Sequence, residues 1–225
     1  MEKRTKKLLV AVAMAGLVGT VNAQSALKGA YGQIGIGYEN NSSSDKGGTY
    51  TATGGGQSPL SRNFTKSSGF TGSVGVGYIS SITNTYTLGI GVEYFPINSR
   101  NAGYTYSIPG VTSGTGQWNK ENSYNVFLSP GIVLDKYSLA YAKIGYSSAQ
   151  LKNNNTGSSA TTNNYNGYSL GLGYKQIISG GVYGFAEGNY FNYGDKTSTV
   201  VSNGTSVTKT GVGSHNFLVG VGYKF

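Results

Sequence analysis

The last eleven residues of the chain, His215 to Phe225, alternate between apolar positions and small or polar positions. One face carries Phe217, Val219, Val221, Tyr223 and Phe225, and the other carries Asn216, Leu218, Gly220, Gly222 and Lys224. A period of two predicts a half-buried β-strand, and aromatic residues at the end of such a strand suit a membrane–water interface. The alternative is the closing strand of a soluble β-sandwich or barrel.

Seven earlier segments repeat this alternation, at residues 30–39, 70–79, 86–96, 124–134, 139–148, 168–175 and 182–190. A kernel of alternating apolar residues and glycines followed by tyrosine recurs among the strands, as IGIGY, VGVGY, LGLGY and again VGVGY. Pro130 cannot donate a hydrogen bond to a neighbouring strand, so we expect a bulge or a local kink in the fourth segment. The pattern therefore predicts eight strands and no helix of useful length.

The connections between these segments alternate strictly between short and long. Residues 80–85, 135–138 and 176–181 form the short ones, and residues 40–69, 97–123, 149–167 and 191–214, rich in Asn, Ser, Thr and Gly, form the long ones. In an up-and-down meander, odd and even connections lie at opposite ends, so one rim carries tight turns and the other carries long loops. A soluble lipocalin-like barrel of eight strands requires neither this asymmetry nor an apolar exterior.

This strand pattern and the terminal aromatic residue resemble the small eight-stranded outer-membrane β-barrels of bacteria, namely the OmpA transmembrane domain, OmpX and the opacity proteins. The resemblance implies an all-β fold, an eight-stranded antiparallel up-and-down transmembrane β-barrel with short periplasmic turns and long extracellular loops. It also implies that Tyr223 and Phe225 form a C-terminal assembly signal. The likeness is one of architecture, so it does not by itself give the function.

The same resemblance implies a location and a set of partners. We expect the protein in the cell outer membrane of a Gram-negative bacterium, surrounded by outer-membrane lipid and lipopolysaccharide. The barrel-assembly machinery and periplasmic chaperones are its expected partners during biogenesis. We expect a monomer, with a possible surface ligand bound by the loops.

The N-terminus has the pattern of a secretory signal peptide. Lys3, Arg4, Lys6 and Lys7 precede an apolar run at 8–18, and the small-residue site Val-Asn-Ala follows at 21–23. An apolar run of eleven residues is too short to span a bilayer, which needs about 20 residues. We therefore expect a signal peptide at 1–23 and an outer-membrane β-barrel domain at 24–225.

The amino-acid composition excludes some classes of partner and site but does not identify a function. The signal peptide holds four of the 17 basic residues and one of the eight acidic residues, so the formal charge of +9 falls to about +6 in the remaining chain. These charges form no basic stripe, which argues against nucleic acid as a partner. The absence of cysteine excludes disulfides and thiol sites. The mean hydropathy of −0.24 does not argue against a barrel, because lipid-facing and lumen-facing residues cancel.

The charged residues of the predicted strands share the inner face. They are Glu39, Glu93, Lys143, Lys175, Glu187 and Lys224. A lysine on the lipid face near the membrane centre costs about 2–4 kcal/mol, so this placement agrees with a membrane barrel. The interior ion pairs of OmpA-type barrels come from corresponding strands, and the resemblance implies a lumen ion-pair network of Glu93, Lys143 and Glu187. Such a network acts either as a polar plug or gate, or as structural pairing of charges in a narrow lumen.

Aromatic residues of the inner face are expected to fill the lumen opposite inward-facing glycines. They are Tyr31, Phe95, Phe127, Tyr141, Tyr183 and Phe185. A barrel of eight strands is just wide enough for its side chains to fill it. Glycine runs such as GSVGVG lack the Lys-Ser/Thr pair and the helix of a phosphate-binding loop, so we expect no cofactor. No cluster of His, Asp and Glu has the spacing of a metal site.

The single histidine, His215, follows Ser214 at the outer end of the last strand. Some small outer-membrane barrels are lipid A-modifying enzymes with a serine, a histidine and an acid at the outer rim. Adjacent strand residues point to opposite faces, so Ser214 and His215 are poorly placed to hydrogen-bond, and we expect no catalytic residues. The sequence favours a structural scaffold that presents extracellular loops for adhesion or surface interaction. The alternatives are a narrow passive channel for small solutes or ions and, less favoured, a lipid A-modifying enzyme.

Overall fold

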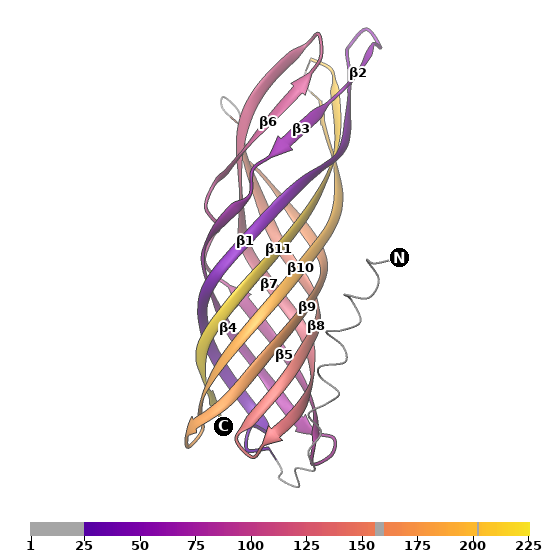
Figure 1. The fold of residues 1–225 in the computed structure, drawn as a ribbon. Helices are drawn as coiled ribbons and strands as arrows, with labels where there is room; N and C mark the ends of the chain where they lie inside the picture. The colour runs from indigo at the N-terminus through magenta and orange to yellow at the C-terminus, as the bar shows by residue number, and fades with distance from the viewer. Residues whose placement is uncertain (1–24, 156–159, 202) are drawn as a thin grey trace, which may run out of the picture.

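The structure is a computed structural model that describes residues 25–155, 160–201 and 203–225. Its strands run diagonally around a long, closed barrel (Figure 1). The predicted signal peptide at 1–23 lies outside the described residues. The described part of the chain contains no helix that is long and apolar enough to cross a membrane.

Eight long strands form the ring: β1 (Gly29–Thr51), β4 (Ser67–Ser81), β5 (Tyr86–Phe95), β7 (Thr112–Asp135), β8 (Ser138–Asn155), β9 (Thr161–Ser179), β10 (Val182–Val201) and β11 (Thr205–Lys224). Each pairs antiparallel with its neighbours in the chain, and β1 pairs with β11 to close the ring. The eight predicted segments correspond to these eight strands. The predicted all-β, up-and-down barrel is therefore confirmed.

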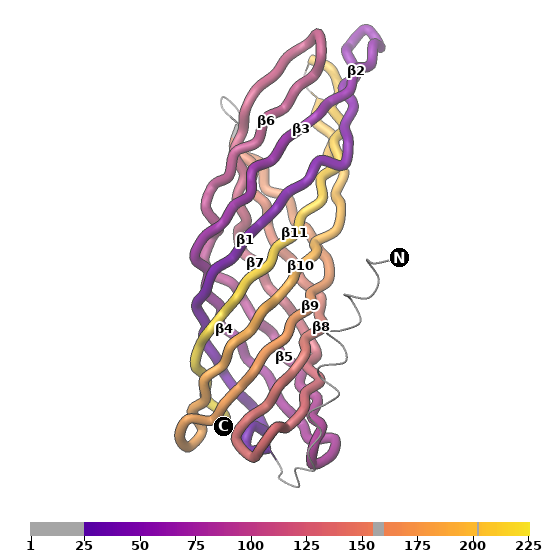
Figure 2. The backbone as a smooth tube through the Cα atoms, viewed as in Figure 1, coloured from indigo at the N-terminus to yellow at the C-terminus, as the bar shows by residue number. Residues whose placement is uncertain are grey.

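The limits predicted for the long connections were wrong, because most of their residues continue the strands. β1 has 23 residues and β7 has 24, and Figure 2 shows the strands running on well past the middle of the molecule. We call the part of the barrel that these continuations of the strands form the extended end. It also contains three short strands, namely β2 (Gln57–Pro59), β3 (Ser61–Phe64) and β6 (Ala102–Ile108). β2 pairs with β1, while β6 joins β7 to β3. Residues with a loop-like composition form strands here because neighbouring strands supply partners for their backbones.

Three register shifts mark the start of the extended end. They fall between Asp45 and Gly48 on β1, between Asn192 and Asp195 on β10, and between Glu121 and Tyr124 on β7. Such bulges change which face a side chain occupies and increase the local twist.

The bulge predicted at Pro130 is absent, so that prediction was wrong. Pro130 stays in register opposite Leu88 on β5. On the β8 side, the pairs on either side of it, Leu128 with Ile144 and Gly131 with Tyr141, belong to one register. The strand pairing therefore continues past Pro130, which lacks a backbone N–H, without a shift in register.

The outward face of the ring forms an apolar belt bounded by two aromatic girdles. The girdle near the extended end takes one exposed residue from each of the eight strands: Tyr38, Phe70, Tyr94, Tyr124, Tyr146, Tyr168, Tyr190 and Phe217. The girdle near the tight turns holds Tyr78, Tyr86, Tyr137, Tyr174, Tyr223 and Phe225. Exposed aliphatic residues such as Ile36, Val76 and Ile90 lie between them. This belt is the surface that a bilayer covers.

Candidate functional site in the lumen and on the extended wall

Aromatic side chains fill the lumen against inward-facing glycines. All six aromatic residues predicted to point inward are buried, with exposed fractions of 6% or less. A Cβ atom at Gly91 would lie 2.6 Å from the Phe127 ring, and one at Gly35 would lie 3.0 Å from the Phe185 ring. The glycines therefore provide the space that the rings occupy, and the predicted packing of large against small residues is confirmed.

The structure brings Glu93, Lys143 and Glu187 together in the middle of the lumen. The Lys143 Nζ atom lies 2.7 Å from Glu93 Oε2 and 3.1 Å from Glu187 Oε1. Asn125 donates a hydrogen bond to Glu93 at 2.9 Å, and the Tyr141 hydroxyl donates one to Glu187 at 2.6 Å. Each carboxylate therefore has a cation and a neutral donor, which is what a buried ion pair requires in order to be tolerated.

Lys175 lies nearer the tight turns and has no carboxylate partner among the described residues. Its Nζ atom lies 3.7 Å from the centre of the Tyr31 ring, 5.0 Å from that of Tyr183 and 5.4 Å from that of Tyr141. The side chain is buried. The three rings supply cation–π contacts in place of an acid. Lys224, the last residue predicted on the inner face, is half-buried at the rim.

A second ion pair lies at the level of the outer girdle. Glu39 pairs with Lys120, and both side chains are buried. The Ser214 hydroxyl donates a hydrogen bond to Glu39 at 2.8 Å, and the Asn41 amide donates one at 3.3 Å. The sequence placed Glu39 correctly but did not identify Lys120. Asn125 and Phe127 face inward on β7, so regular alternation would have placed Lys120 on the outer face. The bulge of β7 between Glu121 and Tyr124 shifts the alternation and turns Lys120 inward.

The extended end has an apolar core that continues the buried cluster of the lumen, since the rings of Phe95 and Phe191 lie 5.7 Å apart, centre to centre. Its buried residues are Leu60, Ala102, Trp118, Ala149, Leu151, Tyr165, Phe191, Tyr193 and Val212. Trp118 has no exposed surface. The gap between β1 and β3 is bridged by an ion pair of 3.0 Å between Arg62 and Asp45, and Arg62 also donates to the Lys209 carbonyl at 3.0 Å. The part of the chain predicted as loops is thus a packed continuation of the barrel.

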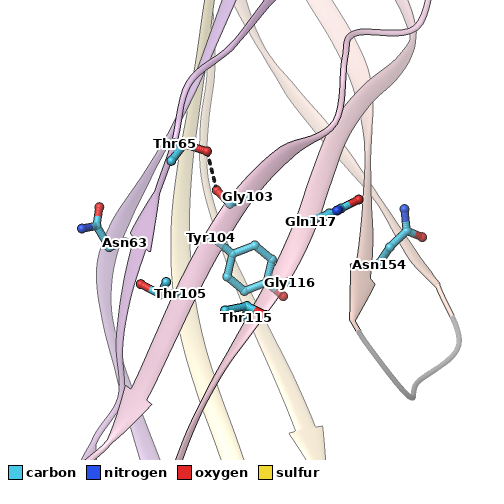
Figure 3. A pocket seen from close by; sticks show the side chains of 9 residues that line it. All are labelled: Asn63, Thr65, Gly103, Tyr104, Thr105, Thr115, Gly116, Gln117 and Asn154. Carbon is cyan, nitrogen blue, oxygen red and sulfur yellow. Dashed lines mark hydrogen bonds between the residues drawn. The ribbon is translucent and has the colours of Figure 1, made fainter.

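Two adjoining hollows of about 580 and 510 Å³ lie on the wall of this extended end, where β3, β6 and β7 run side by side. They share Asn63, Thr105 and Thr115, and we call them together the outer groove. Figure 3 shows the larger hollow, which reaches Asn154 of β8, with the Thr65 hydroxyl donating to the Gly103 carbonyl at 2.7 Å. The exposed side chains of the lining carry hydroxyl or amide groups.

The pair formed by Ser214 and His215 does not form a catalytic arrangement in the structure. Ser214 is buried and donates to Glu39, whereas His215 is exposed and lies opposite Tyr190 of β10. Their side chains occupy opposite faces of β11, as the sequence predicted. Among the described residues there is also no group of three or more His, Cys, Asp or Glu side chains that could hold a metal ion.

A closed ring of eight strands with an apolar outer belt, two aromatic girdles and a charged, filled lumen defines an integral membrane β-barrel. Sequence comparison finds no matching family model and no similar curated protein. Among solved structures, the outer membrane protein OprG from Pseudomonas aeruginosa is similar with a TM-score of 0.58 and 14% identity, over 91% of this chain and 99% of that chain.

Two other solved structures are more distant. Ail, the attachment invasion locus protein of Yersinia pestis, in complex with the heparin analogue sucrose octasulfate, has a TM-score of 0.46 and 14% identity, over 88% of this chain and 99% of that chain. The outer membrane protease OmpT from Escherichia coli has a TM-score of 0.49 and 10% identity, over 89% of this chain and 98% of that chain. The fold of this chain is that of an outer-membrane β-barrel of Gram-negative bacteria, and its belt places it in that membrane. The tight turns then face the periplasm and the extended end faces the cell exterior.

Proposed function

We propose that this protein is a non-enzymatic surface-binding protein of the outer membrane, whose outer groove binds a partner outside the cell. The observation that carries the proposal is the groove itself, a preformed hollow on a wall of paired strands. The apolar core behind it, with Trp118 fully buried, holds this wall in place. Binding to a surface that is already ordered avoids the entropy cost of ordering a loop.

The chemistry of the groove favours an uncharged, polyhydroxylated partner such as a neutral glycan. Its serine, threonine, asparagine and glutamine side chains both donate and accept hydrogen bonds, which is what a sugar hydroxyl requires. Arg62 is the one charged residue of the described lining, and its guanidinium is engaged by Asp45. A polyanion would find no free cation in the groove.

Binding of maltoheptaose and chitopentaose to the purified protein in lipid nanodiscs tests this proposal, with dextran sulfate as the charged comparison. Thr105→Lys and Thr115→Lys place long charged side chains in the groove and are expected to lower binding about tenfold or more, since each removes hydrogen-bonding groups and space from the site. Thr199→Lys is the matched control, because Thr199 is an exposed threonine of β10 outside the groove. Equal binding by all three variants would show that the groove is not the site.

The lumen argues against a passive channel as the main function. Aromatic rings, two buried ion pair clusters and the apolar core of the extended end occupy it in succession. The geometry of Ser214 and His215 argues against a lipid A-modifying enzyme. We expect the lipid A mass spectrum of cells that carry His215→Ala to equal that of cells with the unmodified protein.

We also propose how the protein reaches and enters the outer membrane. The signal peptide at 1–23 directs export, and periplasmic chaperones and the barrel-assembly machinery insert the monomer beside outer-membrane lipid and lipopolysaccharide. Tyr223 and Phe225, whose rings lie 5.2 Å apart on the lipid face, serve as the C-terminal assembly signal. Replacing both with alanine is expected to leave protein in the periplasm, which cell fractionation measures.

A further inference from the structure

The chain crosses the periplasmic mouth of its own barrel before it enters β1. Residues 25–28 form a short turn in which Leu27 N donates to the Ser25 hydroxyl at 3.2 Å and Lys28 N donates to the Ser25 carbonyl at 3.3 Å. Ala26 N then donates to the Lys136 carbonyl at 2.8 Å. Lys136 belongs to the tight turn between β7 and β8, which lies nearly opposite β1 in the ring. We call residues 25–28 the strap.

An apolar side chain of the strap closes the mouth from inside. Leu27 is 1% exposed and belongs to the same buried cluster as Ile79, Val133 and Leu139. Those three residues lie near the periplasmic ends of β4, β7 and β8. A leucine outside a regular strand is buried to this extent only where other side chains surround it, so the strap fills the opening rather than lying across its rim.

Gly29 is the point at which the strap turns away from the barrel wall. Its φ angle is +124°, a backbone conformation that residues with a side chain rarely adopt. A Cβ atom there would lie 3.1 Å from the Phe225 carbonyl oxygen and 3.2 Å from Lys224 Cε. On one side of Gly29 the backbone is fixed by the pairs of β1 with β4 and β11. On the other side, the backbone bond from Ala26 to Lys136 connects the strap to the far wall.

We infer that the strap is a periplasmic gate that turns about Gly29 and controls access from the periplasm to the lower lumen. The burial of Leu27 and the backbone bond to Lys136 hold it, and neither belongs to the strand pairing of the ring, so the strap can open while the ring stays closed. Behind it lies Lys175 with its three tyrosine rings. Lys175 is opposite Leu139 in the β8–β9 register, and Ile177 donates to the Tyr137 carbonyl in the turn that holds the strap.

The rate at which Lys175 is acetylated measures how often this gate is open. The full-length protein in lipid nanodiscs is treated with N-hydroxysulfosuccinimide acetate, which does not cross membranes, and acetylation of each lysine is followed by mass spectrometry. In the unmodified protein we expect Lys175 to react far more slowly than the exposed Lys66. Leu27→Ser removes the apolar contact and is expected to raise the Lys175 rate about tenfold or more, since the burial of one leucine side chain is lost.

A second variant and two controls make the result specific. Gly29→Val disfavours the positive φ angle and is expected to release the strap as well, whereas Gly32→Val is the matched control because a Cβ at Gly32 meets nothing within 4 Å. Lys143, which lies farther from the periplasmic mouth, is expected to stay protected in every folded variant. A change of gel migration on heating identifies the variants that have folded. Two outcomes would overturn the inference: Lys175 reacting as fast as Lys66 in the unmodified protein, or an unchanged Lys175 rate in folded Leu27→Ser and Gly29→Val.

Discussion

The ammonium nitrogen of Lys143 lies within 2.8 Å of both carboxylate oxygens of Glu93, in the middle of a membrane-spanning lumen. Removal of this cation leaves Glu93 and Glu187 as two buried carboxylates with neutral donors but without the cation that pairs with them. We expect Lys143→Met to lower the free energy of unfolding by about 3–5 kcal/mol, measured by urea titration in lipid vesicles.

The control for this prediction removes all three charges at once. The triple variant Glu93→Gln, Lys143→Met and Glu187→Gln leaves no unpaired buried charge, so it is expected to be closer in stability to the unmodified protein than Lys143→Met alone. If Lys143→Met were as stable as the unmodified protein, the network would contribute nothing to the fold.

Conductance in planar bilayers tests whether the lumen is closed. We expect small and infrequent events from the unmodified protein, because rings and ion pairs fill a barrel of eight strands. Lys143→Ala is expected to raise the conductance, since it shortens a central side chain and leaves two carboxylates that attract water. A large and steady current through the unmodified protein would contradict the filled lumen.

Gly91 provides a test of packing between rings and glycines. A Cβ atom there would lie 2.6 Å from the Phe127 ring, so Gly91→Ala is expected to destabilise the barrel by about 1–3 kcal/mol through overpacking. Gly188→Ala is the matched control, because a Cβ at Gly188 meets nothing within 4 Å. Adding Phe127→Leu to Gly91→Ala is expected to restore part of the loss in the same urea titration; no recovery would mean that the ring is not the obstacle.

Ile36 tests the position of the bilayer. Its side chain is 57% exposed within the belt, so Ile36→Lys places a charge in lipid and is expected to cost about 2–4 kcal/mol. Thr49→Lys, on the same strand but beyond the outer girdle, is expected to change stability by no more than about 0.5 kcal/mol. Equal effects of the two substitutions would mean that the bilayer does not cover the belt.

Trp118 tests whether the extended end is a packed body. Trp118→Ala leaves a cavity in its core and is expected to cost about 3–5 kcal/mol. Hydrogen exchange should then speed up in β3, β6 and the outer half of β7, while the amides of the belt stay protected, because the strand pairs of the closed ring hold them without Trp118. Trp118→Phe, which keeps a ring, should show a smaller change. Rapid exchange of β3 and β6 in the unmodified protein would instead indicate mobile loops.

The sequence by itself determined the barrel. Alternation with a period of two assigned each side chain of the belt to lipid or lumen, because strand geometry fixes that choice wherever a ladder is regular. Glu93, Lys143 and Glu187 were placed on the inner face in this way, and the alternation of short and long connections gave the topology. These rules are local, and they hold for any strand that has one buried face.

Only the tertiary structure decided what lies outside the belt. Residues of β1 and β7 beyond the outer girdle carry serine, asparagine and glycine, whose weak alternation does not reveal that partner strands pair with them. The bulge before Tyr124 shifts the alternation, so the sequence pattern did not identify Lys120 as the partner of Glu39. The strap and the outer groove join residues that are far apart in the chain, and such contacts arise from the closure of the ring rather than from any period in the sequence.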